Sequence, residues 1–87
     1  MTRFEWLNSV LGLEFDRYVL DHPDFAKNIP QDAIVVLQLK GEDAFNEWAR
    51  NIAEFHREEG QPLLYVRISG LTPPRSRLIR PVIAKTA

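Results

Sequence analysis

The residues with the clearest chemical potential form a basic cluster near the C-terminus: Arg75, Arg77, Arg80 and Lys85. Pro73 and Pro74 precede the cluster and make this stretch stiff and extended. Arginine binds phosphates in a sequence-independent, salt-sensitive way, and its planar fork binds protein carboxylates equally well. No aromatic residue follows Tyr65, so a base-stacking surface for single strands is missing. The pattern therefore favours an arm that binds acids of its own chain or of a second subunit, and leaves nucleic acid as an alternative partner.

Catalytic and metal-binding chemistry has little support in the sequence. His56 is a candidate general base or metal ligand on the apolar face of an expected helix, but no nearby His or Cys completes a metal-binding spacing. The glycine-containing turn over residues 40–44 carries Glu42 and Asp43, which would repel a phosphate from the following helix N-terminus. We therefore assign no catalytic residue, metal or cofactor. The sequence favours a non-enzymatic role without excluding an enzyme.

Charge is distributed unevenly along the 87 residues. Residues 1–59 hold all twelve acids and six bases, whereas residues 60–87 hold five bases and no acid. This asymmetry indicates either an anionic partner or an arm that lies on acidic helices. The chain has no cysteine, no run long enough to span a membrane and no recognisable signal peptide, so we expect a cytoplasmic location.

The N-terminal part, residues 3–21, has the periodicity of a helix with two apolar stripes. The first stripe consists of Phe4, Leu7, Leu11, Phe15 and Tyr18. The second consists of Trp6, Val10, Leu13 and Leu20. A helix with two apolar stripes needs two surfaces, so we expect the first stripe to pack on the chain's own sheet and the second to form a dimer interface.

The central part reads as strand, helix and strand. Residues 33–39 and 63–68 are apolar runs typical of strands covered on both faces. Residues 42–59 between them form an amphipathic helix, with Phe45, Trp48 and Phe55 assigned to its apolar face and Gly60 to its C-terminal cap. Such a unit is expected to be parallel with a right-handed crossover. The fold class is therefore α/β: a small single domain with an N-terminal helix and a βαβ unit.

A two-stranded sheet is marginal by itself, so a further element is expected to extend it. Residues 77–84 are β-prone, but Pro81 restricts them to an edge strand or an extended arm. We accordingly divide the chain into a core over residues 1–70 and an arm over residues 71–87, packed on its own or a partner subunit.

The order of these parts resembles a family of short, uncharacterised prokaryotic proteins, a domain of unknown function. The resemblance covers nearly the whole chain and is carried by residues 15–23 (Phe-Asp-Arg-Tyr-Val-Leu-Asp-His-Pro), Phe25-Ala26, Ile29-Pro30, residues 58–62 (Glu-Glu-Gly-Gln-Pro) and residues 73–77 (Pro-Pro-Arg-Ser-Arg). It implies no activity, so no functional residue is transferred from it.

These observations predict a non-catalytic, homodimeric protein-interaction module. The alternative is a nucleic-acid-binding accessory protein that uses the basic arm. A second protein partner also remains open, and no membrane partner is expected.

Overall fold

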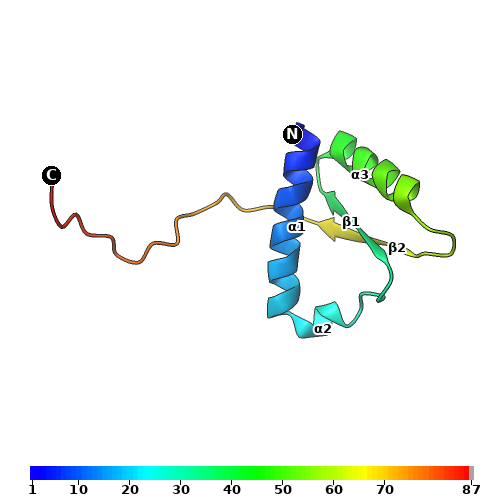
Figure 1. The fold of residues 1–87 in the computed structure, drawn as a ribbon, viewed down its shortest axis with the longest axis horizontal. Coiled ribbons are helices and arrows are strands. Elements are labelled where there is room, and N and C mark those ends of the chain that lie inside the picture. Colours follow the sequence, from blue (N-terminus) through cyan, green and yellow to red (C-terminus); the bar gives the residue numbers. More distant parts are fainter. Residues whose placement is uncertain (87) are drawn as a thin grey trace.

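The computed structural model describes residues 1–86 and has five elements in the order α–α–β–α–β (Figure 1). They are α1 (Arg3–Asp21), α2 (Pro23–Ala26), β1 (Ile34–Leu39), α3 (Asp43–His56) and β2 (Leu63–Ile68). The predicted fold class is confirmed: an N-terminal helix precedes a parallel β1–α3–β2 unit, and an extended segment follows. No helix within residues 1–86 is long and apolar enough to cross a membrane.

Helix α1 begins and ends where its local sequence requires. The Thr2 hydroxyl accepts from the Glu5 amide and the Glu5 carboxylate accepts from the Thr2 amide, both at 3.1 Å. This capping box satisfies two of the amides that a helix start leaves unpaired. At the other end, the residue before Pro23 is biased away from helical dihedral angles, and His22 has φ −131° and ψ 74°. The first apolar stripe faces the body, with Leu7 and Leu11 buried.

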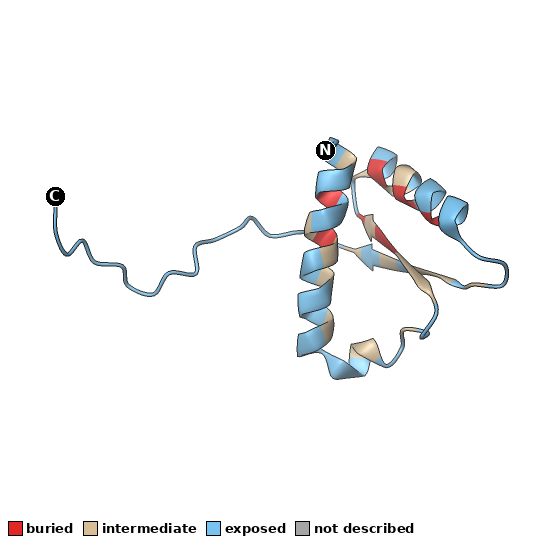
Figure 2. Cartoon of the chain, viewed as in Figure 1, coloured by how far each residue is buried: buried red, intermediate tan, exposed pale blue. Residues whose placement is uncertain are grey.

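The core lies between α1, β1 and α3 (Figure 2). Phe45 is fully buried, and its ring packs against Phe4 of α1 at a centroid distance of 6.0 Å. Val36 and Leu37 are adjacent in β1 and point to opposite faces, yet both are buried. β1 is therefore covered on both of its faces, as its continuous apolar sequence predicted. The same prediction was wrong for β2, where Tyr65 and Arg67 are exposed on one face. β2 pairs with β1 in parallel, with Ile34 opposite Leu63 and Leu39 opposite Ile68.

Two expectations about α3 were wrong. Phe55 was assigned to the apolar face but is 83% exposed. The buried residues Phe45, Ala49 and Ala53 follow a four-residue spacing, and a residue two positions after Ala53 is rotated by about 200° to the other side of the helix. The helix also ends at His56, with Arg57 in extended conformation as its C-cap, so Gly60 (φ +78°) belongs to the turn before β2.

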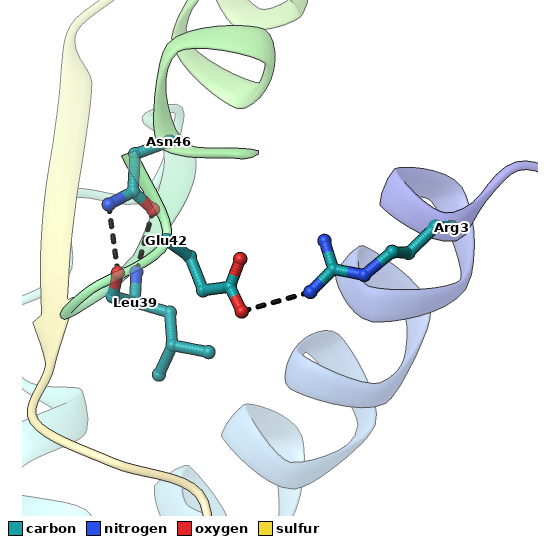
Figure 3. A network of polar contacts seen from close by, with 4 residues as sticks. All are labelled: Arg3, Leu39, Glu42 and Asn46. Carbon is teal, nitrogen blue, oxygen red and sulfur yellow. Dashed lines mark hydrogen bonds and ion pairs between the residues drawn. The ribbon is translucent and has the colours of Figure 1, made fainter. Parts of the chain in front are cut away.

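An asparagine side chain joins the start of α3 to the end of β1 (Figure 3). The Asn46 amide nitrogen donates to the Leu39 carbonyl and the Asn46 amide oxygen accepts from the Leu39 N–H, each at 2.8 Å. Nearby, Arg3 of α1 forms an ion pair with Glu42 at 2.9 Å. These contacts hold the β1–α3 turn against the neighbouring elements.

Residues 69–86 contain no helix or strand and extend away from the body (Figure 1). The predicted extended arm is therefore present, and within the described residues it does not form the edge strand considered as its alternative. Arg80, with φ +42°, bends the arm just before Pro81. Ala87, the last residue of the predicted arm, lies outside the described residues.

Candidate interaction surface

The four predicted binding residues of the arm, Arg75, Arg77, Arg80 and Lys85, are all exposed. Within residues 1–86 the ion pairs join Arg3 to Glu42, Arg17 to Glu14, Lys27 to Asp24 and Arg57 to Glu54. None of them involves an arm base. Ion pairs between the arm and acids of its own chain, one of the two predicted arrangements, are thus not present in the described residues. Pairing of the arm with a second subunit stays a prediction.

The arm is also strongly apolar. Four aliphatic residues in its second half, Leu78, Ile79, Val82 and Ile83, are 73–91% exposed. Full burial of such a side chain is worth about 1.5–3 kcal/mol, so this surface favours association. The basic residues interleave with the aliphatic ones, which suits a partner surface that is apolar with acidic groups at its edge.

The predicted dimer residues of α1 lie away from the core. Trp6, Leu13 and Leu20 are exposed by 56%, 53% and 79%, and Val10 is half-buried. α1 therefore has one stripe that is buried at Leu7 and Leu11 and a second stripe that is largely open. Contact between the open stripe and a second copy of the chain stays a prediction.

A hollow of about 510 Å³ lies where α1, α2 and the end of β2 meet. Its apolar walls include Leu11 and Phe15 of α1, Phe25 of α2, and Val66 and Ile68 of β2. Tyr18 also lines it and packs edge-to-face on Phe25, with ring centroids 5.2 Å apart. Glu14 supplies an acidic wall and forms an ion pair with Arg17 at 2.8 Å.

Sequence reasoning missed this hollow, although part of its wall was visible in the sequence. Phe15 and Tyr18, at the C-terminal end of the first apolar stripe, were expected to pack on the sheet. α1 instead leaves these residues short of full burial, and Tyr18 is 47% exposed.

His56 does not acquire catalytic surroundings. It is exposed at the last residue of α3, where its ring lies edge-on to Phe55 at a centroid distance of 5.3 Å, and it lines a hollow of about 200 Å³ beside β1. Across residues 1–86, no group of three or more His, Cys, Asp or Glu side chains is arranged to hold a metal ion.

The two edges of the sheet differ, a feature that no local sequence pattern predicted. The edge of β1 is partly closed: the Asn46 amide satisfies Leu39, and Gln38 Nε2 donates to the Leu37 carbonyl at 3.2 Å. Among residues 1–86, no side chain forms a comparable hydrogen bond with the outward backbone groups of β2. A hydrophobic hollow, an open strand edge and a free apolar arm are thus the features available for binding.

The fold and these surfaces define a small α/β domain that pairs a parallel βαβ unit with an exposed basic, apolar arm. The chain belongs to a family of unknown function (DUF5647), which it matches over residues 3–81. The resemblance inferred from the sequence is thereby confirmed. The match extends through the first part of the arm, up to Pro81. No curated protein and no solved structure gives a significant match to the chain.

Proposed function

We propose that this chain is a cytoplasmic, non-catalytic protein-interaction module that acts as a homodimer. The observation that carries the proposal is the arm, whose aliphatic residues Leu78, Ile79, Val82 and Ile83 are 73–91% exposed. Burial of such a segment against a partner lowers its free energy. The absence of cysteine agrees with a reducing compartment.

Two further features support association. The open stripe of α1 adds Trp6, Leu13 and Leu20 to the exposed apolar surface. The family match includes arm residues 71–81, which supports treating the arm as part of the family's common domain. A chain of this size also has a thin core, and a second subunit is one way to stabilise it.

The test is sedimentation equilibrium of the full chain at micromolar concentrations. The proposal expects a mass of about twice the 10.1 kDa of the chain. A variant with Leu78, Ile79, Val82 and Ile83 all changed to Ser should sediment as a monomer, whereas Phe55→Ser, which removes an exposed aromatic outside the arm, should remain dimeric. A wild-type mass of 10.1 kDa throughout this range would refute the homodimer.

Nucleic-acid binding is the second candidate, because the four arm bases have no acidic partner among residues 1–86. Phosphate binding of this kind weakens steeply as salt increases. Affinity for labelled duplex DNA and RNA should therefore fall between 50 and 200 mM salt and be lost when Arg75, Arg77 and Arg80 are changed to Ser. Changing the same three residues to Lys keeps their charge and should retain most of the affinity. Salt-independent binding, or none, would count against this candidate.

A further inference from the structure

We infer that the arm of a second copy docks on the open edge of β2 as an added strand and covers the hollow beside α1. This inference rests on the proposed homodimer and adds to it the site and the manner of docking. It follows from the hydrogen bonding of the sheet, the position of the hollow, and the composition and direction of the arm.

The hydrogen-bond pattern shows which backbone groups of β2 are open. Ile34 N donates to the Pro62 carbonyl and Lys40 N donates to the Ile68 carbonyl, each at 3.0 Å. With the observed register, the alternation of a parallel ladder directs the N–H and C=O of the even-numbered β2 residues toward β1. The corresponding groups of Leu63, Tyr65 and Arg67 point outward. None of them has a hydrogen-bond partner among residues 1–86.

The opposite edge of the sheet is less available. Asn46 occupies both backbone groups of Leu39, and Gln38 occupies the carbonyl of Leu37. The rest of that edge lies in a hollow flanked by Asn8 of α1 and by Trp48 of α3. Within residues 1–86, an incoming strand therefore finds a continuous row of free donors and acceptors along β2 and an interrupted row along β1. Strand addition at an open edge is a common mode of peptide binding, in which backbone bonds supply affinity and side-chain pockets supply specificity.

The hollow supplies such a pocket on the same side of the molecule. Val66 and Ile68 of β2 form part of its wall, and Leu11 and Phe15 of α1 form another part. A strand added beside β2 extends this surface, so aliphatic side chains from that strand would lie against the hollow. The arm offers aliphatic residues in two extended segments, Leu78–Ile79 and Val82–Ile83, on either side of the bend at Arg80.

The charge of the arm is opposite to the charge of the helices beside the hollow. Residues 14–24, which run along the hollow, contain four acids and one base, whereas arm residues 75–85 contain four bases and no acid. Glu14 lies in the wall of the hollow itself. A docked arm would therefore place its arginines near an acidic helix end.

The direction of the arm favours a second copy over the same chain. A hairpin back onto β2 requires residues 69–74 to reverse direction, but Pro73 and Pro74 make this connection stiff. Hairpin loops are usually two to five residues long. In the structure the arm instead leaves the end of β2 and extends outward, and the molecule is 61 Å in its longest dimension (Figure 1). Two copies related by a two-fold axis can exchange such arms reciprocally.

Amide hydrogen exchange, measured by NMR on the full chain, tests this inference. At concentrations where the chain is dimeric, the outward amides of Tyr65 and Arg67 should exchange at least 10-fold more slowly than in the four-serine arm variant described above. The amide of Val66 points toward β1, so it should be protected in both proteins and reports that the fold is intact.

A pair of substitutions tests the same edge independently. Tyr65→Pro removes the outward N–H and leaves the bonds to β1 in place, whereas Tyr65→Ala removes only the side chain. The dimer dissociation constant should increase at least 10-fold more for Tyr65→Pro than for Tyr65→Ala. Equal effects would overturn strand addition at β2.

The outcomes separate the two proposals. A stable dimer with rapidly exchanging Tyr65 and Arg67 amides keeps the homodimer and overturns docking at β2. Protection of these amides that persists in the arm variant means that another strand, such as the partner's β2, occupies the edge, and this also overturns docking of the arm. A monomer at all concentrations overturns both proposals.

Discussion

Removing the Asn46 side chain should weaken the connection between β1 and α3. In Asn46→Ala, the Leu39 N–H loses its partner at 2.8 Å in a part-buried site, and the Leu39 C=O loses one of two partners, since it also accepts from the Glu42 N–H at 3.1 Å. Each hydrogen bond contributes about 0.5–1.5 kcal/mol net, which gives a loss of about 1–3 kcal/mol for the pair. Alanine is the better helix former by at most about 0.7 kcal/mol. The net expectation is a destabilisation of about 1–2 kcal/mol.

Asn51→Ala is the matched control for this variant. Asn51 lies on the same helix, is exposed, and its side chain makes no hydrogen bond within residues 1–86. The same substitution there should be neutral or stabilising by a few tenths of a kcal/mol, since only the helix propensity changes. The difference in stability between the two variants therefore measures the Asn46–Leu39 bonds alone.

The assay is thermal unfolding followed by tryptophan fluorescence, with all proteins at one concentration because association would change the apparent stability. For a domain of this size, a loss of 1 kcal/mol lowers Tm by about 4–8 °C. Asn46→Ala should thus melt about 4–16 °C below wild type. If Asn46→Ala melts at the same temperature as Asn51→Ala, the Asn46 hydrogen bonds do not stabilise the end of β1. The conclusion that Asn46 closes this edge of the sheet would then be wrong.

Two further predictions concern packing and backbone conformation. Phe45→Ala, at a fully buried position, should lower the free energy of unfolding by about 3–5 kcal/mol and remove most of the far-ultraviolet circular dichroism. Phe55→Ala, at an exposed site, should stay within about 0.5 kcal/mol of the wild-type stability. Similar losses for both variants would contradict the assignment of the core. Gly12→Ala, in α1 with nothing within 4 Å of the added Cβ, should stabilise by about 0.5–1 kcal/mol, whereas Gly41→Ala at φ +87° should destabilise by about 1 kcal/mol or more. Thermal melts of the two glycine variants that shift in the same direction would refute this reading of their conformations.

The sequence alone determined the order and type of the elements because each depends on neighbouring residues. The apolar runs at 33–39 and 63–68 indicated strands, and the strands extend over Ile34–Leu39 and Leu63–Ile68. The His22-Pro23 pair marked the end of α1 within one residue, because a proline restricts the residue before it. The double stripe of α1 and the proline-stiffened arm were also visible from composition and spacing.

Tertiary structure decided which of these surfaces are covered and which stay open. Phe55 looks like a core residue in sequence and lies in solvent, because the rotation of α3 over β1 depends on where Phe45, Ala49 and Ala53 pack. The closing of one sheet edge depends on the turn that brings Asn46 beside Leu39, and no local pattern encodes that distance. The open edge of β2, the hollow beside it and the lack of acidic partners for the arm bases within residues 1–86 all arise from the relative placement of distant segments. Side-chain type and spacing determine the secondary structure and chemical character of each segment. The accessibility of that segment depends on contacts between residues that are far apart in the chain.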